Sequence, residues 1–155
     1  MKGTVEQPVP CLTCLSNTGE RRISPGQTIY QGRHWLIEHA YPCGLVGWLV
    51  IVLRRHAEAM HELAPDEWAE LGSLQQKAAT LLHSGLQCEK EYVMGIADVP
   101  GFTHVHFHVI AKPRDLNAEL VGTRIFAMLK VGPEEAVPPE TVAEFCDQLH
   151  KLFLT

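Results

Sequence analysis

The sequence predicts an α+β protein in which an antiparallel sheet of about five strands packs with two main helices. Strand-type and helix-type segments follow in the order strands, helix, strands, helix, which favours an antiparallel sheet over a parallel one. The chain has 155 residues, a length at which one domain can bury a sizeable core without disulfides. We therefore expect a flexible N-terminal tail over residues 1–10 and a single domain over residues 11–155.

The strands are predicted from short apolar or alternating segments, which are residues 29–31, 35–39, 48–53, 92–96 and 104–110. The first two are separated by Gly32 and Arg33, an arrangement typical of a hairpin. The third is continuously apolar and rich in β-branched side chains, which indicates a buried strand. The turn into the last strand is expected at Pro100 and Gly101.

The helices are predicted from apolar residues that recur at helical spacing. The first is expected to begin at Pro65, because a proline followed by two acidic residues suits a helix N-terminus. Its apolar stripe consists of Trp68, Leu71, Leu74, Ala78, Leu81 and Leu82. The last helix is expected from about Pro139, with an apolar face of Val142, Phe145, Cys146, Leu149 and Phe153. Residues 56–63 are also expected to form a short helix.

The composition narrows the class of ligand. A net charge of −5 without a run of basic residues argues against nucleic-acid binding, which needs a basic footprint. The longest apolar run, residues 44–53, is too short to span a membrane, and the first residues show no signal peptide. We therefore expect a cytoplasmic protein whose ligand is a small molecule.

The most informative segment is residues 104–110, in which His104, His106 and His108 alternate with apolar residues. The strand period places all three imidazoles on one face, and chance alone gives such a pattern below about 1% of the time. Imidazole can be a nucleophile, a proton donor or a metal ligand near neutral pH. On a straight strand the Cα atoms of His104 and His108 are about 13 Å apart, so all three rings can barely reach one ion. A division of roles along a phosphate chain is therefore favoured.

This pattern resembles the motif of the histidine-triad (HIT) family of nucleotidyl hydrolases and transferases, which is His-φ-His-φ-His-φ-φ with φ apolar. Residues 47–56 resemble the family's strand that ends in a basic pair and a histidine, here His56. The pair Cys11 and Cys14 resembles the zinc-binding opening of many bacterial members. The resemblance covers residues 11–114 and implies the HIT-like fold.

For catalysis, the resemblance implies that His106 attacks the α-phosphorus and forms a nucleotidyl-histidine intermediate. His106 must be neutral to attack, so a backbone carbonyl that accepts its other N–H would select the useful tautomer. His108 would bind the phosphate oxygens and stabilise their charge. Many relatives have Gly-Gln-Ser/Thr ahead of the triad, where this chain has Pro-Gly-Phe-Thr, so Thr103 is the expected substrate-binding hydroxyl. The ribose-binding residue of relatives falls near Ala40.

For metal binding, the resemblance implies a zinc site made of Cys11, Cys14, His56 and His104. A Cys₂His₂ set is a closed tetrahedral site, and the zinc would therefore be structural. The residues alone also allow the two cysteines to be ordinary buried thiols. Relatives form two-fold dimers, and we expect a homodimer that uses the apolar run 48–53 and the aliphatic face of residues 68–82.

The sequence thus predicts an enzyme that cleaves a phosphoanhydride or phosphoramidate bond, with a dinucleoside polyphosphate or a nucleoside phosphoramidate as substrate. Two alternatives remain open. One is a metalloenzyme in which two triad histidines and an outside ligand hold a catalytic ion. The other is a non-catalytic nucleotide-binding module that retains the HIT-like fold.

Overall fold

A computed structural model describes residues 9–155, so most of the predicted tail, residues 1–8, lies outside the described residues. The chain forms one five-stranded sheet in the order β1-β2-β3-β5-β4, and every neighbouring pair is antiparallel. The strands are β1 (Tyr30–Gln31), β2 (Trp35–His39), β3 (Trp48–Leu53), β4 (Lys90–Met94) and β5 (His106–Lys112). The predicted α+β class, the antiparallel sheet and the β1–β2 hairpin are confirmed.

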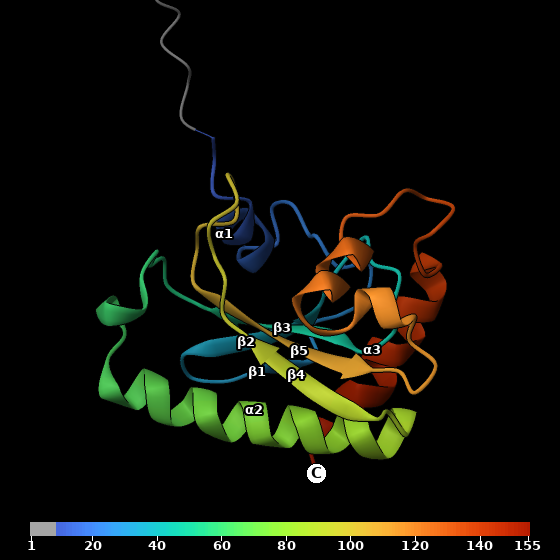
Figure 1. The fold of residues 1–155 in the computed structure, drawn as a ribbon. Helices are drawn as coiled ribbons and strands as arrows, with labels where there is room; N and C mark the ends of the chain where they lie inside the picture. The colour runs from blue at the N-terminus through green and yellow to red at the C-terminus, as the bar shows by residue number, and fades with distance from the viewer. Residues whose placement is uncertain (1–8) are drawn as a thin grey trace, which may run out of the picture.

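Helical segments cover both faces of the sheet (Figure 1). They are α1 (Leu12–Asn17), α2 (Pro65–Leu86) and α3 (Pro139–Phe153), with short 3-10 helices η1 (Met60–Glu62), η2 (Ala118–Leu120) and η3 (Gly122–Met128). The long helix α2 runs along one face, whereas α1, η2 and η3 lie over the other. The two main helices begin at Pro65 and Pro139, as the sequence predicted.

The main core lies between the sheet and the apolar faces of α2 and α3. On α2 the buried apolar residues are Leu71, Leu74, Ala78 and Leu82, and on α3 they are Val142, Cys146, Leu149 and Phe153. Phe107 and Val109 of β5 belong to the same core. Because strand side chains alternate, His106 and His108 project to the opposite face, under η3.

Three predicted boundaries are wrong. Residues 56–63 contain only the single turn η1, because the carbonyl of Ala57 accepts a hydrogen bond from the backbone of Val105 instead of building a helix. The strand predicted at 92–96 is Lys90–Met94, where pairing with β5 determines its position. His104 precedes β5, whose regular pairing begins at His106.

The basic pair at the end of β3 ties the sheet to α2. Arg55 donates from Nε and Nη2 to both carboxylate oxygens of Glu67, at 2.7 and 2.8 Å. Glu67 also accepts from the backbone N–H of Ala64 at the start of the helix. The bonds from Arg55 lower the pKa of Glu67 to about 2, so the carboxylate stays charged at the helix N-terminus, where negative charge is favoured. Arg55 therefore has a structural role in this fold.

The surfaces proposed for dimer contact must be reassigned. β3 pairs with β2 on one side and with β5 on the other, so the run 48–53 lies inside the sheet and cannot form an interface. β4 pairs only with β5 and leaves an edge of the sheet open.

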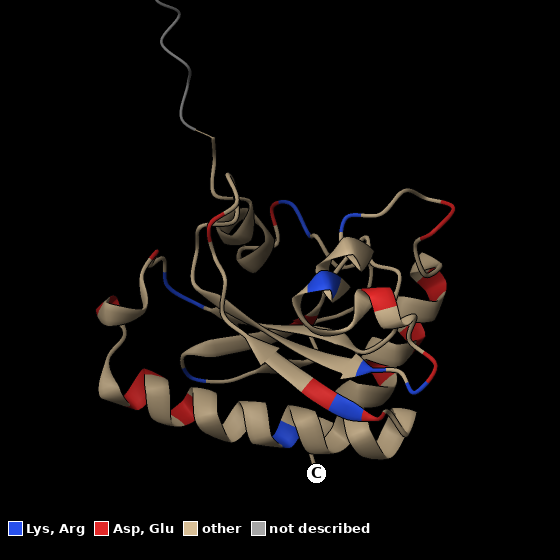
Figure 2. Ribbon diagram, viewed as in Figure 1, with Lys and Arg blue, Asp and Glu red and all other residues tan. Residues whose placement is uncertain are grey.

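None of the described helices is long and apolar enough to cross a membrane. Acidic and basic residues are interspersed along the described elements (Figure 2).

Candidate functional site

A cavity of about 410 Å³ lies on the face of the sheet opposite α2. Its floor includes Val50 and Val52 of β3 and the two triad residues His106 and His108 of β5. Segments from the N-terminal part of the chain and from η3 form its walls. A volume of this size, with mostly apolar walls and a few polar groups, is typical of a site for a small molecule.

His106 is held in one tautomer by the backbone. Its Nδ1 donates to the carbonyl oxygen of His104 at 2.7 Å, and a carbonyl can only accept. The proton of a neutral ring is thus on Nδ1, and Nε2 retains its lone pair. Burial, followed by the charge of Lys130, lowers the pKa of His106 against the opposing effect of the backbone bond. The ring is therefore neutral near pH 7, as a nucleophile requires.

His108 is held in the opposite tautomer by Trp48. The indole Nε1, which can only donate, donates to Nδ1 of His108 at 2.9 Å. The proton of the neutral His108 ring must therefore be on Nε2. Burial and the neighbouring His106 lower the pKa of His108 to about 3. His108 thus offers a neutral N–H donor.

The two rings form a complementary pair, with centroids 4.9 Å apart. One presents a lone pair and the other an N–H, so the pair can attack an electrophilic phosphorus and bind one of its oxygens. Phe126 of η3 contacts the ring of His108 edge-on, with centroids 4.9 Å apart, and limits its rotation. Sequence reasoning identified both histidines and missed Trp48, because only the pairing of β3 with β5 brings the indole to His108.

The four predicted metal ligands lie together at the other end of the triad. Nδ1 of His104 is 3.6 Å from Sγ of Cys11 and 3.4 Å from Sγ of Cys14. Nδ1 of His56 is 3.3 Å from Sγ of Cys14. All four ligand atoms lie within 4.8 Å of one another. In a tetrahedral zinc site, usual bond lengths place nitrogen and sulfur ligands about 3.5 Å apart. The set therefore has the spacing of a zinc site.

The groups around these four residues orient the ligand atoms. Nε2 of His104 donates to the carbonyl of Leu53 at 2.7 Å, which leaves Nδ1 free to bind a metal. Nε2 of His56 is 3.4 Å from a carboxylate oxygen of Glu58. The backbone N–H of Cys14 donates to Sγ of Cys11 at the start of α1. Metal-binding histidines commonly have such acceptors on their second nitrogen. The Cys11, Cys14, His56 and His104 cluster could therefore bind a metal.

A second group contains His83, Cys88 and Glu91. His83 Nδ1 is 2.7 Å and Cys88 Sγ is 3.1 Å from the same carboxylate oxygen of Glu91. These are hydrogen-bond lengths, shorter than the roughly 3.3–3.5 Å between ligands of one zinc ion. We interpret this group as hydrogen-bonded.

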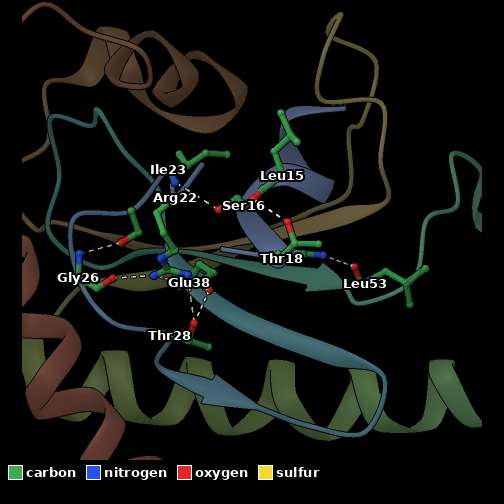
Figure 3. Close-up of polar contacts among 11 residues, drawn as sticks. Leu15, Ser16, Thr18, Arg22, Ile23, Gly26, Thr28, Glu38 and Leu53 are labelled. Atoms are coloured by element: carbon green, nitrogen blue, oxygen red, sulfur yellow. Dashed lines mark hydrogen bonds and ion pairs between the residues drawn. The ribbon is translucent and has the colours of Figure 1, made fainter. Parts of the chain in front are cut away.

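Glu38 and His39, the residues next to the expected ribose-binding position, form hydrogen bonds within the protein. Both carboxylate oxygens of Glu38 accept from Arg22, at 2.8 and 3.0 Å, and Thr28 adds a further bond (Figure 3). His39 is almost fully buried: Nδ1 donates to the carbonyl of Ala40, and Nε2 accepts from the backbone of Gly47. Burial lowers the pKa of His39 to about 4. No local pattern in the sequence predicts the Arg22–Glu38 pair.

Thr103 lies just outside the cavity walls. Its hydroxyl donates to a carboxylate oxygen of Glu58 at 2.9 Å, while the neighbouring Phe102 lines the cavity. The predicted substrate-binding role of Thr103 stays a prediction.

Comparisons with known proteins show the family and the fold of this chain. A protein-family model described as "Scavenger mRNA decapping enzyme C-term binding" matches residues 13–121. A Zn-bound histidine triad family protein from Mycobacterium smegmatis has a similar structure, with a TM-score of 0.66 and 15% identity over 92% of this chain and 94% of that chain. A Hit-like protein involved in cell-cycle regulation from Bartonella henselae gives a TM-score of 0.66 and 14% identity over 88% of this chain and 91% of that chain. A histidine triad (HIT) protein from Sinorhizobium meliloti gives a TM-score of 0.63 and 20% identity over 82% of this chain and 89% of that chain.

No curated protein matches the sequence. The family match nevertheless covers well over half of the chain, and the similar solved structures share its fold. The chain belongs to the scavenger mRNA decapping enzyme C-terminal binding family and has the HIT-like fold. The resemblance inferred from the triad is therefore confirmed.

The first prediction concerns the bond between Trp48 and His108. Replacing Trp48 with Phe keeps an aromatic ring but removes the donor, so the Nδ1–H tautomer of His108 should become populated. Nitrogen-15 NMR of the histidine rings measures this ratio directly. Trp35→Phe is the control, because its indole donates to a backbone carbonyl on the other face of the sheet. An unchanged His108 tautomer in the Trp48→Phe protein would contradict the assignment.

Proposed function

We propose that this protein is a nucleotide hydrolase or nucleotidyl transferase that cleaves a phosphoanhydride or phosphoramidate bond at the α-phosphorus, through a nucleotidyl group on His106. Family membership implies a nucleotide-related hydrolase or transferase. The main observation that supports the proposal is the hydrogen bond from His106 Nδ1 to the carbonyl of His104. This bond places the ring proton on Nδ1, so that Nε2 has a free lone pair.

The reaction would proceed in two steps. In the first, Nε2 of His106 forms a bond to the α-phosphorus, and the bond from phosphorus to the leaving oxygen or nitrogen breaks. The leaving atom keeps the electron pair of that bond, and a leaving nitrogen also takes a proton from solvent and departs as the amine. The Nε2–H of His108 donates to a non-bridging phosphate oxygen, whose negative charge grows in the transition state. In the second step, water or an acceptor hydroxyl attacks the same phosphorus, loses its proton to solvent and releases His106.

The contacts favour this reading over a metalloenzyme built on the triad. Nδ1 of His104 points to the two cysteines, away from the cavity, and Nδ1 of His108 is occupied by Trp48. A catalytic ion would need two of the three rings to converge with an outside ligand. A non-catalytic binding module is distinguished by experiment, because it would never carry a covalent adduct.

The second prediction tests the nucleophile. His106→Ala should lose turnover of diadenosine tetraphosphate by several orders of magnitude, as the loss of a covalent catalyst does. Intact-mass analysis of wild-type protein denatured at alkaline pH, where a phosphorus–nitrogen bond to histidine is stable, should show one adenylyl group, and the variant should show none. His61→Ala, on the exposed turn η1, is the control. If His106→Ala keeps more than about a tenth of the rate, a barrier change below roughly 1.4 kcal/mol, the assignment is wrong.

We also propose that Cys11, Cys14, His56 and His104 hold one structural zinc ion. The proposal rests on the nitrogen–sulfur spacings of 3.3–3.6 Å among them. The four residues come from the start of α1, the segment after β3 and the segment before β5. A bound Zn²⁺ would therefore join three parts of the chain next to the catalytic pair, and its binding would stabilise the fold.

The third prediction tests the metal. Elemental analysis of purified protein should find about one zinc per chain, and Cys14→Ser or His56→Ala should lower both the zinc content and the melting temperature. Cys88→Ser, in the second group, should leave zinc content unchanged. Unchanged thermal stability after chelation has removed all zinc would refute the structural role.

The fourth prediction concerns assembly. We propose a two-fold homodimer in which the open edge of β4 meets its copy, because an unpaired edge offers free backbone N–H and C=O groups. Val93 on this strand is 46% exposed, which is high for a valine. Light scattering at micromolar concentration should give twice the chain mass, and Val93→Lys should shift it toward the monomer. A wild-type monomer would rule out the proposal.

A further inference from the structure

Lys130 lines the catalytic cavity and, apart from its effect on the pKa of His106, binds no group in the mechanism above. It is the only lysine or arginine among the described residues that line this cavity. Its ammonium lies over the ring of Phe102, 4.5 Å from the centroid. Phe102 lines the same cavity and precedes the triad, whereas Lys130 follows η3. The contact therefore holds a cation between the two segments that flank the histidine pair.

The backbone of Lys130 is fixed in an unusual conformation. Its φ angle is +56°, in the left-handed region that residues other than glycine rarely adopt. The surrounding structure maintains it: the N–H of Lys130 donates to the carbonyl of Pro42 at 2.9 Å, and Leu129 forms a β-bridge with Cys43. Strained residues held in this way tend to occur at functional sites. The backbone contacts thus fix the position of the Lys130 Cα and Cβ atoms without a bound ligand.

Among the described residues, no carboxylate forms an ion pair with Lys130. The other charged residue lining the cavity, Glu38, is fully paired with Arg22 and Thr28. Lys130 therefore keeps its charge beside the cavity, and this charge is one of the causes, after burial, that lower the pKa of His106. In a chain of net charge −5, this local cation favours an anion beside His106.

We propose that Lys130 binds the phosphate next to the α-phosphate, so that the site prefers nucleotides whose leaving group is itself a phosphate. This inference rests on the proposed function. When the bond from the α-phosphorus to the bridging oxygen breaks, the electron pair stays on that oxygen and the departing phosphate gains negative charge. A lysine ammonium stabilises such charge as a point cation, without the bidentate geometry of arginine. An amine leaving group would gain nothing from this contact.

Calorimetric titration with AMP and ADP separates the two phosphates. The measurements use the His106→Asn protein, which cannot form the covalent intermediate, with and without Lys130→Met. We expect Lys130→Met to weaken ADP binding by about tenfold and AMP binding by less than about threefold, because only ADP carries the second phosphate. Lys130→Arg should retain most of the preference for ADP. Arg124→Met, whose guanidinium contacts backbone carbonyls of η2 and Val121 outside the cavity, is the charge-matched control.

Two results would overturn the inference: equal losses for AMP and ADP, or no loss for either. Methionine keeps the Cβ and the length of lysine, and an unchanged melting temperature will exclude a folding effect. The adenylyl adduct on His106 reports separately on the proposed function. If the adduct forms but the affinity for ADP is unchanged in the Lys130→Met protein, only this inference fails. If ADP binding depends on Lys130 but no adduct forms, the phosphate contact stands and the proposed reaction fails.

Discussion

The antiparallel register of β3 against β5 is the constraint on which the candidate site depends. It pairs Val50 with His108 and Val52 with His106, and so places Trp48 where its indole reaches the ring of His108. A slip of one residue would turn both histidines toward α2 and its apolar core. The buried apolar residues of β3 and β5 oppose such a slip, because it would move them out of the core. Packing on one face of the sheet therefore maintains the chemistry on the other.

The same arrangement decides where each proton sits. Buried imidazoles need partners for their polar atoms, and each triad ring has one: a backbone carbonyl for His104 and His106, and an indole for His108. These partners divide three chemically identical side chains into a metal-type ligand, a lone-pair donor and an N–H donor. Burial keeps the two cavity rings neutral, so the division persists across the physiological pH range.

Much of this was predictable from local patterns. The period of two in residues 104–110 and the continuous apolar run of β3 predicted buried strands, and the stripes after Pro65 and Pro139 predicted the helices. The four metal-type ligands were predicted from their residue types and a family resemblance. The helix α1 and the turns η2 and η3 were missed, because such short helices have little intrinsic stability and are held by contacts with the rest of the fold.

By itself, the sequence determined the fold class, the main elements and the identity of the triad, because periodicity and residue type are local properties. Only the tertiary structure decided which group each histidine faces. The pairing of Arg22 with Glu38, the donor from Trp48 and the position of Lys130 beside Phe102 all join residues far apart in the chain. Such contacts depend on strand register and loop packing, which minimise the free energy of the whole fold rather than of any one segment. The shape and the charge of the cavity are therefore properties of the assembled fold.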